Sequence, residues 1–227
     1  MIAYLKPGQP PAFPDPRNAE EGLVAAGGDL SVERLLHAYD QGIFPWFSQH
    51  ELPLWWCPDP RGVLEVDNLH VSRSLERRIR RGDFELTWNR AFGEVLRECG
   101  RFRQDGTWIH SRVIRAYEQL FELGHAHSLE VWQDGELVGG LYGVQRGGVF
   151  SAESKFYRQR DMSKVALVAS VQSLFRAGIE VYDVQFRTDY LARLGVTEVL
   201  RERFVASVRQ LRDKPVDLGS LEPSISA

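Results

Sequence analysis

Apolar positions recur along the chain with two different periods, and each period predicts one type of element. A spacing of three or four residues predicts helices over residues 32–41, 111–123, 164–177 and 201–212. Alternation of apolar and polar positions predicts strands over residues 128–133 and 181–186. Helices and strands in mixed order, without an internal repeat, predict an α+β fold.

Residues 137–156 predict a β-hairpin that carries an acid and a base. Gly147 and Gly148 supply the backbone freedom that a tight turn needs. Glu153 and Lys155 lie two positions apart near the end of the second strand, so regular alternation places both on one face. Because charged groups are costly to bury, we expect this hairpin to form the floor of a substrate site.

The first sixty or so residues differ from the rest in being rich in proline and aromatic residues. Residues 7–18 predict an extended arm, and the proline-broken segments 42–47 and 54–61 predict loops held by ring packing rather than by backbone ladders. For Trp46, a place in a small core and an exposed platform for a nucleobase are equally open. We expect an N-terminal domain over residues 1–61, a second domain over 62–227, and a loose tail from about residue 215.

Composition excludes several classes of protein. The 227 residues are 43% hydrophobic and 26% charged, as is typical of a soluble globular protein. No apolar run approaches the roughly 18 residues that a membrane span needs. The N-terminus lacks a secretory pattern, so we expect a cytoplasmic protein with both cysteines reduced. No set of residues has metal-ligand spacing and no nucleotide-binding loop is present, so we expect neither a metal nor a cofactor.

Segment 71–82 is the one strongly basic stretch of a chain whose formal net charge is −3. It contains Arg73, Arg77, Arg78, Arg80 and Arg81. Ser72 is positioned to cap a short helix there, and Glu76 is the only acidic residue of the segment. A solvated helix face is the ordinary interpretation of such a run. Clustered arginines suit bidentate phosphate contacts better, and we favour phosphate binding.

The polar residues with potential chemistry are Glu153, Lys155, Asp183 and Gln185. Nucleophilic catalysis fits poorly, because neither a Gly-x-Ser-x-Gly elbow nor an activated cysteine motif is present. The strand–helix–strand order of the second half suggests an N-acyltransferase that uses acetyl-CoA. The turn at residues 157–164 has no glycine, which disfavours close approach of a pyrophosphate and therefore CoA. A structural carboxylate that caps a loop is the alternative role for Asp183.

Several motifs of the chain resemble the leucyl/phenylalanyl-tRNA–protein transferase family. They are Ala-Glu-Glu-Gly-Leu-Val-Ala-Ala-Gly-Gly-Asp-Leu-Ser at 19–31, Gly-Ile-Phe-Pro-Trp-Phe at 42–47, Leu-Trp-Trp-Cys-Pro-Asp-Pro-Arg at 54–61, Ala-His-Ser-Leu-Glu-Val-Trp at 126–132, Leu-Val-Gly-Gly-Leu-Tyr-Gly-Val at 137–144, Ala-Glu-Ser-Lys-Phe at 152–156, Asp-Val-Gln at 183–185 and Leu-Ala-Arg-Leu-Gly at 191–195. The resemblance runs from about residue 13 to about residue 205 in the expected order.

The resemblance implies a small N-terminal α/β domain, a C-terminal acetyltransferase-like domain without CoA, and a bacterial cytosolic enzyme. Such an enzyme moves Leu, Phe or Met from aminoacyl-tRNA to the N-terminal Arg or Lys of a protein, which marks that protein for degradation. We expect a monomer without a membrane partner. By similarity, Trp46 and Trp108 would hold the 3′-terminal adenosine, and the acceptor stem would contact Arg73, Arg77, Arg80 and Arg81.

By the same resemblance, Glu153, Asp183 and Gln185 would line the reaction centre, and Leu141, Phe150 and Lys155 the aminoacyl pocket. We expect Gln185 to orient or accept from the attacking amine, Asp183 to fix and polarise Gln185, and Glu153 to hold an ammonium group. Binding the two substrates within reach would supply most of the acceleration.

The chain departs from the family pattern at three positions, with Lys155 in place of Met, Val184 in place of Cys and Tyr190 in place of His. Lys155 either pairs with Glu153 on its own strand face, which we favour, or recognises a polar or acidic aminoacyl group. Val184 is expected to face away from Asp183. Two rival functions stay open, a CoA-dependent N-acyltransferase and a non-catalytic module that binds RNA ends.

Overall fold

The computed structural model describes residues 2–101 and 106–226 and confirms the predicted α+β fold. The chain first forms a four-stranded sheet of order β1-β2-β4-β3. The bounds of its strands are β1 Ala3–Leu5, β2 Leu23–Gly27, β3 Phe44–Pro45 and β4 Leu54–Trp56. Helix α1, Val32–Tyr39, connects β2 to β3 and begins at the predicted cap Ser31, whose side chain accepts from the amide of Arg34.

The prediction that ring packing alone holds segments 42–47 and 54–61 is wrong. Strand β4 pairs with both β2 and β3, so backbone ladders as well as ring packing hold these residues. Trp55 is fully buried and its indole N–H donates to the carbonyl oxygen of Gly27 at 2.9 Å. Trp46 lies at the surface with 45% of its area exposed. Of the two alternatives for Trp46, the exposed platform is therefore the one that the fold supports.

The second sheet has seven strands in the order β11-β5-β10-β9-β8-β7-β6. Their bounds are β5 Arg61–Leu64, β6 Glu85–Trp88, β7 Ala126–Gln133, β8 Glu136–Arg146, β9 Val149–Tyr157, β10 Val181–Gln185 and β11 Thr197–Val199. Neighbouring strands are antiparallel except β9 and β10, which run parallel. The predicted hairpin is β8–β9, and Gly147 in its turn has φ +54°.

The parallel pair β9–β10 is joined only over a short length. The pairing matches 181–183 of β10 with 149–151 of β9 and goes no further. Beyond that point the two strands separate, and residues 152–155 of β9 and 184–185 of β10 line a cavity. A place where strand pairing ends in this way is a common position for a binding site.

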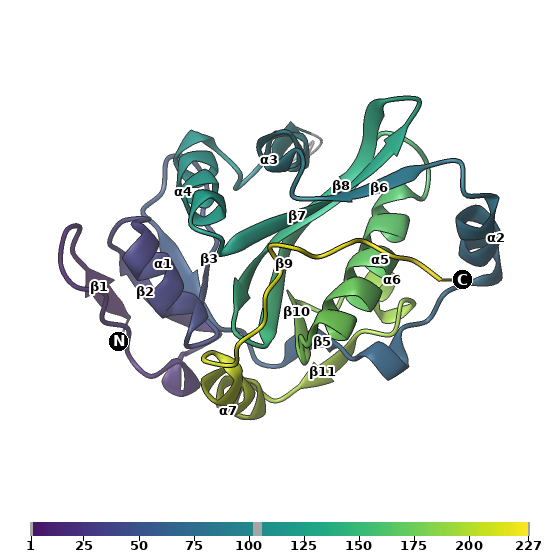
Figure 1. Ribbon diagram of the computed structural model, residues 1–227. Helices are drawn as coiled ribbons and strands as arrows, with labels where there is room; N and C mark the ends of the chain where they lie inside the picture. The colour runs from purple at the N-terminus through teal and green to yellow at the C-terminus, as the bar shows by residue number, and fades with distance from the viewer. Residues whose placement is uncertain (1, 102–105, 227) are drawn as a thin grey trace.

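Helices cover both faces of the large sheet (Figure 1). α3 (Phe92–Arg101) and α4 (Ser111–Glu122) lie on one face, and α5 (Met162–Ala177) lies on the other. α5 is apolar nearly all round, as expected of a central helix. The remaining helices are α2 Arg73–Arg81, α6 Asp189–Ala192 and α7 Arg201–Leu211. Within the described ranges, none of the helices combines the length and the hydropathy that crossing a bilayer requires.

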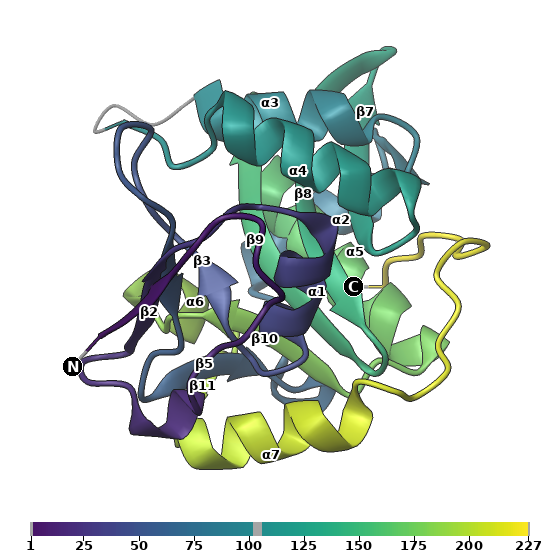
Figure 2. The same cartoon turned by 90° about the vertical axis from the view of Figure 1, so that its left-hand side faces the viewer.

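Two peripheral segments hold the ends of the chain against this framework. Figure 2 shows α7 lying across one edge of the molecule, below β5 and β11. The tail after residue 215 is packed rather than loose, which corrects the prediction. Leu218 is 1% exposed, and the backbone of Ser224 exchanges hydrogen bonds with the hydroxyl of Ser173 on α5. The apolar side chains of the tail supply the burial that the sequence pattern underrated.

Candidate functional site

The centre of the site is a buried ion pair between Arg61 and Asp183. Two guanidinium nitrogens of Arg61 donate to the two carboxylate oxygens of Asp183, each at 2.7 Å. Both side chains are almost wholly buried, at 1% and 0% exposure. Paired charges in this bidentate geometry form the strong class of protein hydrogen bond. Arg61 opens β5 and Asp183 lies on β10, so the pair joins two neighbouring strands.

Arg61 also reaches two segments outside the large sheet. Its remaining guanidinium nitrogen, Nη1, donates to the carbonyl oxygen of Gly42 at 3.1 Å, just after α1. Its guanidinium lies between the rings of Phe44 and Phe204, at 4.9 and 4.4 Å from the ring centroids. Arg61 therefore connects the first sheet and α7 to the strand that carries Asp183.

Asp183 holds the end of β10 in an unusual conformation. Its carboxylate also accepts from the hydroxyl of Ser151 at 2.9 Å and from the backbone amide of Gln185 at 3.0 Å. Gln185 has φ +61°, the left-handed region that is rarely adopted by residues other than glycine. The register against β5 shifts between Asp183 and Gln185. This irregularity breaks the regular alternation of side chains between Asp183 and Gln185.

The amide orientation of Gln185 follows from its neighbours. Its NH₂ group donates to the carbonyl oxygens of Ala152 and Val184, both at 3.0 Å, and the side-chain oxygen is left as the acceptor. Asp183 thus fixes Gln185 through the backbone, and the expected direct polarisation of the amide by Asp183 is not seen. The side chain of Gln185 instead bridges the two strands where they separate.

A β-bulge also corrects the prediction for Glu153 and Lys155. In the β8–β9 ladder, Tyr142 pairs with Ser154 and the next residue, Gly143, pairs with Ala152. Glu153 is the extra residue between them, so the alternation expected along β9 is broken there. Lys155 pairs with Leu141 and turns toward the side of α5, while the carboxylate of Glu153 turns toward Tyr39 and Tyr117. The carboxylate of Glu153 accepts hydrogen bonds from both of these tyrosines.

Glu153 is held in a network of hydroxyl groups. Tyr39 donates to one carboxylate oxygen at 2.8 Å, Tyr117 donates to the other at 3.5 Å, and the two hydroxyls lie 2.6 Å apart. Burial raises the pKa of Glu153 to about 8, with a further contribution from the negative charge of Asp183 and an opposing one from the Tyr39 hydrogen bond. Burial beside Glu153 also raises the pKa of both tyrosines well above the ordinary value, so they remain hydrogen-bond donors.

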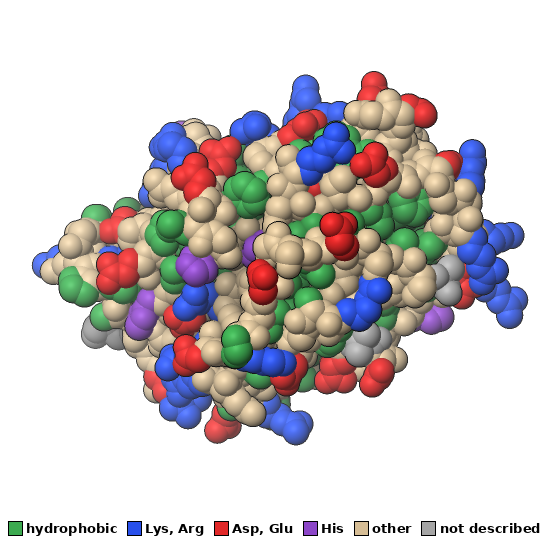
Figure 3. All heavy atoms as spheres, in the orientation of Figure 1, with side chains coloured by type: hydrophobic (Ala, Val, Ile, Leu, Met, Phe, Trp, Pro, Cys, Tyr) green, Lys and Arg blue, Asp and Glu red, His purple; other side chains and the backbone are tan. Residues whose placement is uncertain are grey.

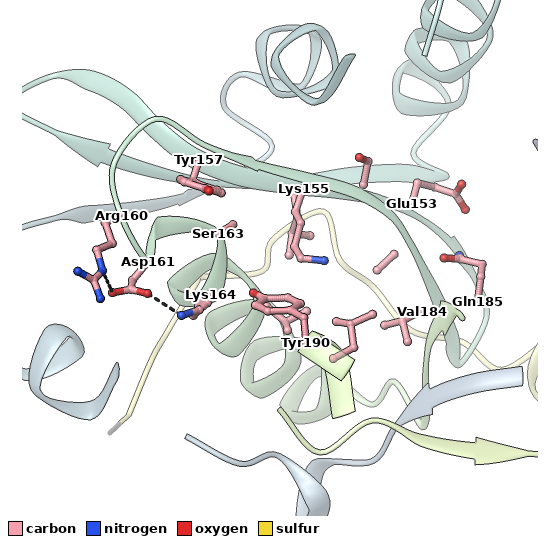
Figure 4. A pocket seen from close by; sticks show the side chains of 15 residues that line it. Glu153, Lys155, Tyr157, Arg160, Asp161, Ser163, Lys164, Val184, Gln185 and Tyr190 are labelled. Carbon is pink, nitrogen blue, oxygen red and sulfur yellow. Dashed lines mark hydrogen bonds and ion pairs between the residues drawn. The ribbon is translucent and has the colours of Figure 1, made fainter. Parts of the chain in front are cut away.

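A cavity of about 600 Å³ opens beside this centre, between the separating strands and α5 (Figure 4). Its apolar lining includes Leu141, Leu167, Val184 and Leu191. Its charged lining consists of Glu153, Lys155, Arg160, Asp161 and Lys164. Lys155, Val184 and Tyr190, the positions at which the resemblance implied other residues, all line this one cavity, although they lie on β9, β10 and α6.

The predicted aminoacyl pocket is only partly this cavity. Leu141 and Lys155 line it, and the Nζ of Lys155 lies 5.3 Å from the centroid of the Tyr190 ring. Phe150 does not line it. That ring is fully buried in the core beneath the sheet, against Trp88 and Tyr182. Val184 faces the cavity rather than only the core.

The two predicted adenosine contacts, Trp46 and Trp108, do come together. They line a second hollow of about 140 Å³ with Phe44, Pro45 and Phe186, next to the large cavity. Glu153 and Gln185 line both spaces, so the two spaces meet at these side chains. Trp46 is exposed, whereas Trp108 is 8% exposed and its ring packs against Tyr117.

The basic helix α2 begins at the predicted cap Ser72 and ends at Gly82. Figure 3 shows a dense group of Lys and Arg side chains at the edge of the molecule where α2 lies in Figure 1. The arginines of α2 differ in whether they form ion pairs. Asp83, just beyond the helix, pairs with Arg78 and Arg81, and Glu76 pairs with Arg80 at 3.4 Å. In the described part of the chain, Arg73 and Arg77 make no ion pair.

Sequence reasoning missed the residues that hold Glu153 and Asp183, which are Tyr39, Arg61, Tyr117 and Ser151. Arg61 had one available signal, since it is a charged residue at the start of a strand that is apolar otherwise. The tyrosines had none, because their hydroxyls meet Glu153 only through long-range packing of α1 and α4. Within residues 2–101 and 106–226, no group of three His, Cys, Asp or Glu side chains is arranged to hold a metal ion.

Comparison with known proteins gives a consistent result over nearly the whole chain. The family model described as "Leucyl/phenylalanyl-tRNA protein transferase" matches residues 63–209, and the model of its N-terminal domain matches residues 28–59. A leucyl/phenylalanyl-tRNA–protein transferase of Pectobacterium carotovorum is 49% identical over 98% of this chain and 97% of the relative. One of Anaeromyxobacter sp. is 53% identical over 90% of this chain and 88% of the relative.

Among solved structures, a GCN5-related N-acetyltransferase from Kribbella flavida matches 69% of this chain and 56% of its own, with 12% identity and a TM-score of 0.40.

The Arg61–Asp183 pair generates a prediction about stability. Asp183→Asn leaves the Arg61 guanidinium buried without a counter-charge, and we expect it to lower the free energy of unfolding by about 3–5 kcal/mol. The double variant Arg61→Met/Asp183→Leu removes both charges and should cost less than the sum of its single variants. Urea unfolding measures each value. As a control, Arg146→Met at the half-buried pair with Asp40 should cost about 1 kcal/mol. Equal losses in Asp183→Asn and Arg146→Met would contradict the central role of the pair.

The raised pKa of Glu153 generates a second prediction. Its folded-state value of about 8 exceeds the ordinary value of 4.5, so the folded protein binds this proton more tightly than the unfolded chain does. The contribution of Glu153 to stability should therefore fall as pH rises from 5 to 8, by roughly 2–4 kcal/mol. Glu153→Gln removes this dependence, so its stability relative to the parent protein should increase over that range. The control Glu33→Gln, on the exposed face of α1, should follow the parent at every pH.

Proposed function

Because the chain belongs to the leucyl/phenylalanyl-tRNA protein transferase family, we propose that it transfers Leu, Phe or Met from aminoacyl-tRNA to the N-terminal Arg or Lys of a protein. The bacterial relatives favour a reaction in the cytosol, where the modification marks its target for degradation. The observation that carries the proposal is the meeting of the large cavity and the tryptophan hollow at Glu153 and Gln185.

The two spaces suit the two parts of an aminoacyl-adenosine. The hollow between Trp46 and Trp108 offers aromatic surface on which a base stacks. The larger cavity, with Leu141 in its wall, receives the amino-acid side chain. The ester that joins the two parts then lies beside Glu153 and Gln185, the only side chains of the described residues that line both spaces.

The reaction needs little from the protein beyond placement. The neutral α-amine of the acceptor protein attacks the ester carbonyl carbon, and a new amide bond forms as the bond to the ribose oxygen breaks. The proton that the amine loses balances the one that the ribose hydroxyl gains. An α-amine has a pKa of about 7.7–8.0 and is partly neutral near pH 7. Holding both reactants in contact supplies the main acceleration.

Gln185 and Glu153 have different tasks in this scheme. The side-chain oxygen of Gln185 accepts from the attacking amine and orients it. Glu153 holds an ammonium group of one substrate, whose charge favours the ionised carboxylate over the neutral one. Asp183 lies too deep to touch either substrate, so we assign it a positioning role through the backbone amide of Gln185 and through Arg61.

The arginines of α2 supply the contact to the rest of the tRNA. Arg73 and Arg77 lie on the exposed helix, and their guanidinium groups match phosphate geometry. Arg80 and Arg81 extend the same surface while pairing with local carboxylates. A protein with an overall negative charge can bind the phosphate backbone through such a local patch.

A transfer assay tests the proposed activity directly. The purified protein should label a peptide that has an N-terminal Arg when supplied with leucyl-, phenylalanyl- or methionyl-tRNA, and should not label the same peptide after N-acetylation. Trp46→Ala and Trp108→Ala each remove one stacking surface, so each should lower kcat/KM for aminoacyl-tRNA by roughly 10–100-fold. Trp132→Ala is the matched control, because Trp132 is a half-buried tryptophan outside both spaces whose indole N–H donates to the hydroxyl of Thr87. Absence of labelling with all three donors would refute the proposal.

The role of α2 can be tested by salt dependence. Arg77→Ala should weaken binding of uncharged tRNA and reduce the slope of log K against log salt by about 1, because one phosphate contact is lost. Arg97→Ala removes an exposed arginine of α3 and should leave both values unchanged. Filter binding at several salt concentrations gives the slopes. Identical slopes for Arg77→Ala and the parent protein would exclude the contact.

A further inference from the structure

A third space lies beside the two that meet at Glu153 and Gln185. It has a volume of about 400 Å³ and lies where the chain leaves β10, and Phe186 and Arg187 form part of its wall. We call it the edge cavity, because β11 at the edge of the large sheet also lines it. Phe186 lines the tryptophan hollow as well, so one ring is a wall of both spaces, directly after Gln185 in the chain.

The segment that joins Gln185 to the edge cavity has a fixed course over β5. A Cβ atom at Gly62 would lie 2.8 Å from the carbonyl carbon of Phe186 and 2.9 Å from the amide nitrogen of Arg187, so only glycine leaves room for this crossing. The amide of Phe186 donates to the carbonyl oxygen of Val184 at 2.7 Å. The position of the edge cavity relative to Gln185 is therefore set by the backbone.

The register of the sheet sets the distance from Gln185 to an acidic residue of this cavity. Gly62 of β5 pairs with Gln185 on one side and with Glu198 of β11 on the other. Because neighbouring strands lie about 5 Å apart, the backbones of Gln185 and Glu198 are about 10 Å apart. Directly opposed residues of an antiparallel pair share a face, so Glu198 projects on the side of Gly62 that Phe186 crosses. A ligand whose amine reaches Gln185 can place a long side chain beside Glu198.

The charged residues of the edge cavity favour a cationic side chain. They are the acids Glu21, Asp59 and Glu198 and the bases Arg187 and Arg201. The two terminal nitrogens of Arg201 already donate to the carbonyl oxygens of Cys57 and Arg17, each at 3.1 Å. Within residues 2–101 and 106–226, neither Glu21 nor Glu198 forms an ion pair. These two carboxylates can therefore pair with a ligand without breaking a contact of the protein.

The apolar wall of the edge cavity suits the hydrocarbon part of such a side chain. The ring of Phe186 is 41% exposed, and Pro58 and Pro60 line the same space. Arginine and lysine side chains lay their methylene groups along apolar surface while the charged end stays in polar surroundings. An aromatic ring also attracts a guanidinium or an ammonium group that lies over its face.

From this geometry we infer that the edge cavity holds the basic side chain of the acceptor protein's N-terminal residue, and that Glu198 and Glu21 bind its charge. The inference rests on the proposed transfer reaction and concerns only the acceptor. With its side chain in the edge cavity, the first residue presents its α-amine to the side-chain oxygen of Gln185. The amine attacks the ester carbonyl carbon, and the ribose hydroxyl leaves as described above. A neutral first residue gains no contact from the two carboxylates.

The test compares two acceptor peptides that differ only in the first residue, which is arginine or citrulline, so that the shape is kept and the charge is removed. The full-length protein and leucyl-tRNA complete the assay. The parent protein should have a kcat/KM at least tenfold higher for the arginine peptide. In Glu21→Gln/Glu198→Gln this ratio should fall at least fivefold, through a higher KM for the arginine peptide, while the KM for leucyl-tRNA stays at the parent value.

A matched variant makes the outcome decisive. Glu202 is exposed on α7 next to Arg201 and does not line the edge cavity, so Glu202→Gln should keep the parent ratio. An unchanged KM for leucyl-tRNA shows that the double variant is folded.

Three results would overturn the inference while the transfer reaction stands. They are equal labelling of both peptides by the parent protein, a parent-like ratio in the double variant, and a KM for leucyl-tRNA that rises as much as the KM for the arginine peptide. If neither peptide is labelled with leucyl-, phenylalanyl- or methionyl-tRNA, the proposed function itself fails.

Discussion

The ion pair between Arg61 and Asp183 is the interaction on which the rest of the site depends. A guanidinium and a carboxylate removed from water lose several kcal/mol of hydration each, and only close pairing with further hydrogen bonds offsets that loss. Here the offset comes from the bidentate contact, the carbonyl of Gly42 and the rings of Phe44 and Phe204. Arg61 and its partners belong to four separate segments, so this arrangement forms only when the two sheets and α7 are assembled together.

The same centre contains two carboxyl groups in opposite electrostatic surroundings. Asp183 faces a guanidinium and accepts four hydrogen bonds, which stabilise its charge. Glu153 is removed from water, and this burial raises its pKa to about 8 even though two tyrosine hydroxyls donate to the carboxylate. Surroundings that differ in this way are typical of paired acids with different tasks. Asp183 is a structural anchor held by Arg61, whereas Glu153 is a buried carboxyl group whose pKa lies near neutral pH.

Sequence patterns predicted most of the elements, because helices such as α4 and α5 and the hairpin β8–β9 have strong local signals. They also placed Glu153, Asp183, Gln185, Trp46 and Trp108 in one neighbourhood, by resemblance rather than by periodicity. The faces of Glu153 and Gln185 were not predictable, since each lies at a bulge that interrupts the two-residue period. Short strands such as β11, with three residues, form only through pairing with β5 and have no signal of their own.

The bulge at Glu153 has a consequence beyond the geometry of one strand. In a regular strand, an acid and a base two positions apart would lie on the same face. The extra residue turns Glu153 toward Tyr39 and Tyr117 and leaves Lys155 above Tyr190 in the cavity. One local irregularity thus places the two side chains in different surroundings, with the acid among tyrosine hydroxyls and the base in the wall of the cavity.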